Sequence, residues 1–161
     1  MSKGMIIIGY QGIGKSTIAG WNKCIDLESG NFFVRGHRRD DWYIPYCQIA
    51  MDLAEQGYTV FVSGHKVVYE YLIGSSCKVV IICPPRTLND QWIEKLQIRY
   101  DTTGLLKDYK ALMNAKESYD DNIVEMCSCG LPVIQINAMD YNLKDYVYRL
   151  QQEAKNSEKD I

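Results

Sequence analysis

A glycine-rich octapeptide near the start of the chain constrains the fold more than any other feature. Residues 9–16 read GYQGIGKS, which matches the phosphate-binding pattern G-x-x-x-x-G-K-[ST] at every specified position. Glycines in such a loop let the backbone curl so that successive N–H groups point inward around an anion. The residues expected to line this phosphate site are Gly9, Gln11, Gly12, Ile13, Gly14, Lys15, Ser16 and Thr17.

Two side chains of this octapeptide have specific expected roles. Lys15 is expected to reach the β- and γ-phosphates of a nucleotide, and the Ser16 hydroxyl is expected to bind Mg²⁺. The flanking sequence supports this interpretation, because Met5–Ile8 is the kind of apolar run that forms a buried parallel strand. Residues 15–21 can then begin a helix whose positive N-terminal end faces the same phosphate.

The composition favours one domain over the whole chain. The 161 residues are 47% hydrophobic, which suits a substantial core. The net charge of −2 comes from 18 basic and 20 acidic residues, so no overall field attracts nucleic acid or an anionic membrane. The chain shows no signal-peptide pattern and no apolar run of roughly 18 residues that would span a membrane. We therefore expect a single cytoplasmic domain, residues 1–161, with neither nucleic acid nor membrane as a partner.

The six cysteines and two histidines show no metal-binding pattern. No C-x-x-C occurs, and the Cys127–Cys129 pair has no second half at the spacing of a zinc site. His37 and His65 are isolated from each other. We expect reduced, structural thiols in a reducing compartment, without bound metal.

Apolar runs alternate with helix-like periods along the chain, which is typical of a parallel α/β sheet. The runs expected to form strands are residues 5–8, 23–27, 59–62, 78–83 and 132–136. The segments expected to form the longer helices are residues 40–56, 66–73, 87–98, 109–129 and 143–154, with fraying from Lys155 onward.

Functional side chains in parallel sheets lie just beyond the carboxyl ends of the strands. Asp26 and Glu28 follow the second expected strand, where carboxylates can accept a proton from a substrate hydroxyl or hold Mg²⁺-bound water. Helix capping or simple solvation of this pair is the alternative. We expect Asp26 to be the catalytic carboxylate, because it directly follows the apolar run.

The densest basic stretch of the chain lies between the second expected strand and the following helix. It reads RGHRR over residues 35–39. The guanidinium groups of Arg35, Arg38 and Arg39 are expected to bind a phosphate or carboxylate of an acceptor substrate, a solvated loop being the alternative. Neighbouring aromatic residues, including Trp42 and Tyr46, suit either core packing or stacking on a base.

The third expected strand, residues 59–62, ends without the Asp of a Walker B motif. This absence disfavours a motor ATPase or a GTPase. His65 follows the strand closely, and we expect it to pack or to cap a helix rather than to take part in catalysis.

Residues 99–107, which read RYDTTGLLK, interrupt the helical pattern between two long helices. We expect a mobile lid in which Arg99 and Lys107 cover the phosphates, with Arg99 neutralising charge during the reaction. A plain turn between helices is the alternative.

In their order along the chain, these segments resemble the small P-loop kinases of the nucleoside monophosphate kinase and gluconate/shikimate kinase type. The resemblance rests on GYQGIGKST at residues 9–17, DLE at 26–28, the arginine-bearing segment and the segment from Arg99; only the first is a specific motif. SGHKVVYEYL, residues 63–72, is similar to a gluconate kinase segment, and the Asp26/Glu28 pair is similar to the D-x-D of shikimate kinases. The chain also resembles small phage-encoded P-loop nucleotide kinases. It departs from adenylate kinases in lacking a DGFPR-like strand end and in having one clear lid arginine.

The resemblance implies a three-layer P-loop NTPase fold with a lid and five parallel strands, usually in the order 2-3-1-4-5. It implies an ATP-dependent phosphotransferase with Mg²⁺ and ATP as cofactors and a nucleoside (deoxy)monophosphate as acceptor. Two alternatives remain open at this point. One is a kinase for a small metabolite of the gluconate or shikimate type, and the other is a nucleotide-binding module with little turnover.

Overall fold

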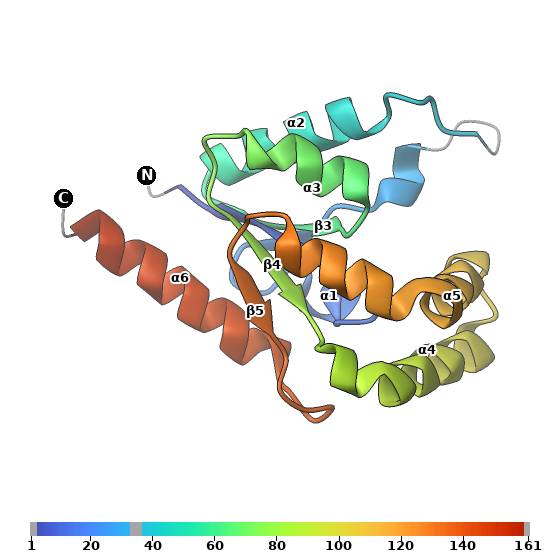
Figure 1. The fold of residues 1–161 in the computed structure, drawn as a ribbon. Helices are drawn as coiled ribbons and strands as arrows, with labels where there is room; N and C mark the ends of the chain where they lie inside the picture. Colours follow the sequence, from blue (N-terminus) through green and yellow to red (C-terminus); the bar gives the residue numbers. More distant parts are fainter. Residues whose placement is uncertain (1–2, 33–36, 160–161) are drawn as a thin grey trace.

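The computed structural model describes residues 3–32 and 37–159, and its centre is a five-stranded sheet in which all paired strands are parallel (Figure 1). The strands are β1 (Met5–Gly9), β2 (Cys24–Asp26), β3 (Thr59–Ser63), β4 (Val79–Cys83) and β5 (Val133–Gln135). Their order across the sheet is β2-β3-β1-β4-β5. The predicted α/β class and the five parallel strands are confirmed, and this order is the one that the kinase resemblance implied.

Helices flank the sheet on both sides (Figure 1). The helices of the described residues are α1 (Lys15–Ile18), α2 (Tyr43–Glu55), α3 (Lys66–Ile73), α4 (Asn89–Thr103), α5 (Leu106–Ser128) and α6 (Leu143–Lys159), with short 3-10 turns η1 (Ser29–Phe32) and η2 (Arg86–Leu88). Figure 1 shows α2 and α3 together on one side of the sheet and α6 on the other. None of the helices in the described ranges is long and apolar enough to cross a bilayer.

The strands form where the sequence carries uninterrupted apolar runs. Every residue of β1 and β4 is buried, and β3 is buried through Val62. In the centre of the sheet Ile7 of β1 lies between Phe61 of β3 and Val80 of β4. A strand covered on both faces has no polar side, which explains the continuous apolar runs.

Several helix boundaries differ from the sequence-based expectation, two of them near the ends of the chain. The helix expected over residues 15–21 ends at Ile18, because the chain turns at Gly20 and then takes positive φ at Asn22 (45°) and Lys23 (60°). At the other end of the chain, α6 continues to Lys159 instead of fraying from Lys155. The prediction that the tail leaves the helix at Lys155 is therefore wrong.

The predicted interruption over residues 99–107 is much shorter than expected. Helix α4 continues to Thr103, where Gly104 ends it with a left-handed φ of 63° and an N–H bond to the carbonyl of Tyr100. Thr102 is still helical, and its hydroxyl donates to the carbonyl of Ile98 at 2.8 Å. The break is confined to residues 104–105, so the prediction that it begins at Arg99 is wrong.

A buried tyrosine joins the carboxyl ends of β2 and β3. Tyr46 of α2 is fully buried, and its hydroxyl donates to the carbonyl of Leu27 (2.6 Å) while accepting from the N–H of Ser63 (2.9 Å). Burial raises the pKa of Tyr46 to about 12, so the hydroxyl keeps its proton. For Tyr46, the sequence-based choice between core packing and base stacking is resolved toward the core, and its hydrogen bonds align the segments that leave these two strands.

We predict that Tyr46→Phe lowers the free energy of unfolding by about 1–3 kcal/mol, because two backbone groups lose their shared partner inside the protein. Urea denaturation monitored by circular dichroism measures this change. Tyr148→Phe is the control, since Tyr148 of α6 is 53% exposed. Equal stability of the two variants would show that the tyrosine hydroxyl does not join the strand ends.

Candidate functional site

A cavity of about 740 Å³ lies at the carboxyl edge of the sheet. Its walls come from the segments that follow β1, β2 and β3 and from one side of α5. A volume of this size is ordinary for a small-molecule binding site. Residues that line the cavity include Lys15, Glu28, Arg38, His65, Lys107 and Asn114.

The glycine-rich loop, Gly9–Ser16, follows β1 and exposes hydrogen-bond donors at this edge. Gly12 and Gly14 have φ values of 91° and 108°, which residues with a Cβ atom rarely adopt. Within the described residues, the N–H groups of Gln11, Gly12 and Gly14 make no hydrogen bond. A curled loop with unpaired N–H groups is an arrangement that can bind an anion.

Lys15 lies at the centre of the charged groups of the site. Its Nζ donates to the carbonyl of Gly9 (3.3 Å), which places the ammonium group beside the loop. Burial lowers the pKa of Lys15, while the carboxylates of Asp26 and Glu28 oppose this change and the cations Arg99 and Lys107 reinforce it. The structure therefore brings together five residues singled out in the sequence: Lys15, Asp26, Glu28, Arg99 and Lys107.

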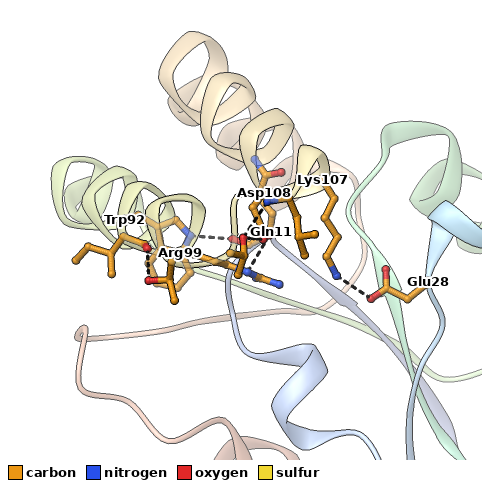
Figure 2. Close-up of polar contacts among 10 residues, drawn as sticks. Gln11, Glu28, Trp92, Arg99, Lys107 and Asp108 are labelled. Atoms are coloured by element: carbon orange, nitrogen blue, oxygen red, sulfur yellow. Dashed lines mark hydrogen bonds and ion pairs between the residues drawn. The ribbon is translucent and has the colours of Figure 1, made fainter.

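The two carboxylates after β2 have different surroundings. Asp26, the last residue of β2, is half-buried, and burial raises its pKa although Lys15 acts in the opposite direction. Glu28 is exposed and pairs with Lys107 of α5 at 3.9 Å, across the cavity (Figure 2). Glu28 adds to the rise in the pKa of Asp26 through its negative charge and a side-chain hydrogen bond, so the two carboxylates act on each other.

Arg99 is held by a residue that sequence analysis did not single out. Its Nε lies 2.9 Å from a carboxylate oxygen of Asp108, which is only 4% exposed (Figure 2). The hydroxyl of Thr103 donates to the same carboxylate. Arg99 therefore joins the end of α4 to the start of α5, and its guanidinium is fixed near Lys15 rather than placed on a long flexible segment.

The three predicted arginines of residues 35–39 have different placements. Arg38 lines the cavity, with its guanidinium 4.1 Å from the centre of the Trp42 ring. Arg39 does not line the cavity; it is exposed and pairs with Asp41 at 3.2 Å. A carboxylate only two residues away offers Arg39 a local partner. Arg35 lies outside the described residues.

His65 belongs to the same wall as Arg38. Its Nδ1 is 2.7 Å from the hydroxyl oxygen of Ser63, and its ring meets that of Trp42 at 5.2 Å and 79°. Burial, with the positive charges of Arg38 and Lys15, lowers the pKa of His65 to about 4. His65 is the N-cap residue that precedes α3, and its side chain makes no capping hydrogen bond; of the two expectations, packing and capping, its side chain therefore fulfils packing.

A group of amide side chains also lines the cavity; Gln11 was among the predicted site residues, whereas sequence analysis missed Asn114 and Asn122. Gln11 Nε2 donates to the carbonyl of Ala111 (3.1 Å) and to Asn114 Oδ1 (3.0 Å), and Asn122 Nδ2 donates to the same oxygen (2.9 Å). These bonds tie the glycine-rich loop to α5. Amide groups carry no charge pattern or periodicity that would have marked them in advance.

The remaining predicted loop residues are placed as follows. The Ser16 side chain is exposed at the start of α1, whereas the Thr17 hydroxyl donates to the carbonyl of Gly14 (2.7 Å) and is used within the loop. No group of three or more His, Cys, Asp and Glu side chains in the described ranges can hold a metal ion. A Mg²⁺ ion here would take Ser16 together with oxygens of a bound phosphate and water, which is a common arrangement for this ion.

The cysteines lie outside the cavity wall. All six are free thiols, and the closest contact that the structure gives is 3.8 Å between the sulfur atoms of Cys83 and Cys127. Burial raises the pKa of the Cys47 thiol to about 12, as expected for a small buried side chain.

No protein-family model matches this chain. No curated protein matches its sequence either. The function of the chain is therefore inferred from its glycine-rich pattern and from the geometry of its cavity.

We predict that His65 stays neutral until about pH 4 in the folded protein, which NMR titration of its ring protons measures. The pKa of His65 in the folded protein lies below the ordinary value of about 6.5, so the stability that depends on a neutral His65 is fully present above about pH 6.5. It is lost as the pH falls toward 4. Arg38→Ala should raise the pKa of His65, and Arg39→Ala, which removes an arginine paired with Asp41, should leave it unchanged. Equal shifts in both variants, or a wild-type pKa at or above 6.5, would contradict the arrangement.

Proposed function

We propose that this protein is a P-loop kinase that transfers a phosphoryl group from Mg²⁺-bound ATP to a nucleoside monophosphate. The observation that carries the proposal is the position of an anion-binding loop and Lys15 beside the same cavity as Arg38. Unpaired loop N–H groups suit the phosphates of the donor. The guanidinium of Arg38 suits the phosphate of the acceptor.

The charge of the cavity supports two phosphate-bearing ligands. Five of its lining residues are Lys or Arg and two are Glu, although the whole chain has a net charge of −2. The lysines and arginine are Lys15, Arg38, Lys66, Lys107 and Lys110. Phosphoryl transfer depends mainly on positioning and charge neutralisation, so a local excess of cations matches its requirements.

The proposed roles follow from these surroundings. Lys15 and the loop N–H groups hold the transferring phosphoryl group, and the Ser16 hydroxyl contributes to Mg²⁺ binding. Asp26 orients or deprotonates the acceptor hydroxyl or phosphate, a role that suits a half-buried carboxylate of raised pKa. Arg99, fixed by Asp108, neutralises charge that builds up near Lys15. In this proposal the lid consists of residues 104–107, the part of the predicted segment 99–107 that lies beyond α4. The free thiols fit a reducing, cytoplasmic compartment.

One observation also favours a second candidate, a kinase for a small carboxylate-bearing metabolite. A guanidinium such as that of Arg38 binds a carboxylate as well as a phosphate. The amide wall formed by Gln11, Asn114 and Asn122 gives a nucleobase hydrogen-bonding partners that a small acid does not need, which is why we favour the nucleotide. Phosphate transfer from ATP, measured with nucleoside monophosphates and with sugar acids as acceptors, separates these candidates. Nucleotide binding without transfer to any acceptor would instead indicate a binding module.

We predict that Lys15→Ala lowers the rate of phosphoryl transfer by about 100-fold or more, as removal of a single charge-stabilising donor does. The fold should persist, because the Lys15 side chain is partly exposed and lies outside the apolar core. Lys78→Ala is the control, since Lys78 is an exposed lysine that precedes β4 at the opposite edge of the sheet. An unchanged rate in Lys15→Ala would contradict the kinase proposal.

We predict that Arg38→Ala raises the KM for the acceptor by about tenfold or more, because a hydrogen bond to a charged group contributes roughly 1.5–3 kcal/mol. The KM for ATP should change little. Arg39→Ala provides a matched control, since this arginine pairs with Asp41 away from the cavity. Steady-state kinetics with each substrate varied separately measures both constants, and equal effects of the two variants would place the acceptor elsewhere.

A further inference from the structure

The carbonyl groups of the glycine-rich loop are hydrogen-bonded by two aromatic side chains from distant parts of the chain. The indole N–H of Trp92 on α4 donates to the carbonyl of Gln11 at 2.9 Å (Figure 2). The hydroxyl of Tyr141, between β5 and α6, donates to the carbonyl of Ile13 at 2.7 Å. These donors are 81 and 128 positions away from their acceptors in the sequence.

These two bonds also determine where two N–H groups point. The carbonyl of Gln11 and the N–H of Gly12 belong to one planar peptide unit. The carbonyl of Ile13 and the N–H of Gly14 belong to another. In a trans unit the C=O and N–H bonds point in opposite directions, and no described peptide is cis. A carbonyl held toward Trp92 or Tyr141 therefore turns the next N–H away from that aromatic side chain.

The two peptide units are also those that the loop itself controls least. Gly12 and Gly14 have φ values of 91° and 108°, and glycine populates positive and negative φ about equally well. By contrast, the N–H of Ile13 is bonded inside the loop, to the carbonyl of Tyr10. The N–H groups of Gly12 and Gly14 have no such bond within the described residues, so their direction depends on the aromatic donors.

Lys95 joins the two aromatic side chains into one unit. The rings of Trp92 and Tyr141 stack at 6.0 Å with an interplanar angle of 18°, and the Lys95 ammonium lies 4.4 and 4.8 Å from their centres. Its Nζ also donates to the Tyr141 hydroxyl at 2.8 Å. Because that hydroxyl accepts from Lys95, its own proton is directed to the carbonyl of Ile13. Burial lowers the pKa of Lys95 to about 8, in agreement with its enclosed position.

We infer that Trp92 and Tyr141 are positioning residues, which keep the N–H groups of Gly12 and Gly14 directed toward the phosphates of a bound nucleotide. The inference rests on the proposed function, because it assumes that these N–H groups bind phosphate. Lys95 supports both side chains without touching the ligand. The contribution is one of preorganisation, since a loop already in its binding conformation loses less freedom when the ligand enters.

The central experiment compares Tyr141→Phe with Tyr119→Phe. The two tyrosine hydroxyls donate to backbone carbonyls at the same distance, 2.7 Å, but Tyr119 bonds Pro85 and not the loop. Calorimetric titration with Mg²⁺–ATP and with inorganic tripolyphosphate measures phosphate binding, and urea denaturation measures the stability of each variant. Tyr141→Phe should weaken binding of both ligands by about tenfold, whereas Tyr119→Phe should bind like the wild type.

The outcomes separate this inference from the proposed function. If the wild-type protein binds neither Mg²⁺–ATP nor tripolyphosphate, the proposed function fails. If the wild type binds them and the two tyrosine variants bind equally well, the inference is overturned, even when both variants lose stability. In the kinase assay, Tyr141→Phe should raise the KM for ATP without changing the KM for the acceptor, a separation that a general loss of structure does not produce.

A second variant keeps the inference testable if Tyr141→Phe folds poorly. Lys95→Met retains most of the aliphatic stem of Lys95 but removes its charge and its bond to Tyr141. We expect a loss of tripolyphosphate affinity of about threefold with Lys95→Met, and NMR signals of the Gly12 and Gly14 amides that move less on titration than in the wild type. Unchanged affinity together with unchanged amide responses would show that the aromatic unit does not position the loop.

Discussion

Strand β1 is the constraint on which the rest of this structure depends. Its residues Ile6, Ile7 and Ile8 are fully buried, so their backbone groups have to be hydrogen-bonded by neighbouring strands. Strands β3 and β4 supply these bonds, one on each side. Because the paired strands are all parallel, the segments that follow β1, β2 and β3 emerge at one edge of the sheet. The glycine-rich loop, the carboxylate of Asp26 and the His65 segment meet there for that reason.

The ion pairs at this edge of the sheet differ in how firmly they are held. Asp108 is buried and accepts from both Arg99 and Thr103, so breaking this contact would leave a carboxylate without partners inside the protein. Glu28 and Lys107 form a long contact of 3.9 Å between partly exposed side chains, and such pairs contribute little to stability. The Glu28–Lys107 contact can therefore be broken at small cost, whereas the contact of Arg99 with Asp108 cannot.

The glycines of the loop and the aromatic side chains around it have different effects on the loop backbone. Glycines 12 and 14 permit backbone angles that other residues avoid, but they leave the direction of the peptide units undetermined. The surrounding aromatic side chains Trp92 and Tyr141 supply that direction from outside the loop. A loop built in this way combines backbone angles that only glycine adopts readily with peptide units held from outside the loop.

Much of the fold followed from local patterns in the sequence. The five apolar runs predicted the strands to within one residue at each end, because a strand buried on both faces has to be apolar without interruption. The helix over residues 66–73 agrees with its prediction, but α4 extends five residues beyond the predicted end at Ile98, since Gly104, rather than the change in composition, ends it. Helix ends depend on single capping groups, which periodicity does not reveal.

The sequence by itself determined the parallel α/β sheet, the glycine-rich loop after the first strand, and Asp26 and Glu28 after the second. Only the tertiary structure decided that Arg38 and not Arg39 faces the cavity, that Asp108 holds Arg99, and that Trp92 and Tyr141 hold the loop. The physical reason is the range of the interactions. Strands and loops are specified by neighbouring residues, whereas these contacts join side chains through directions and distances that exist only once the sheet and its helices have packed.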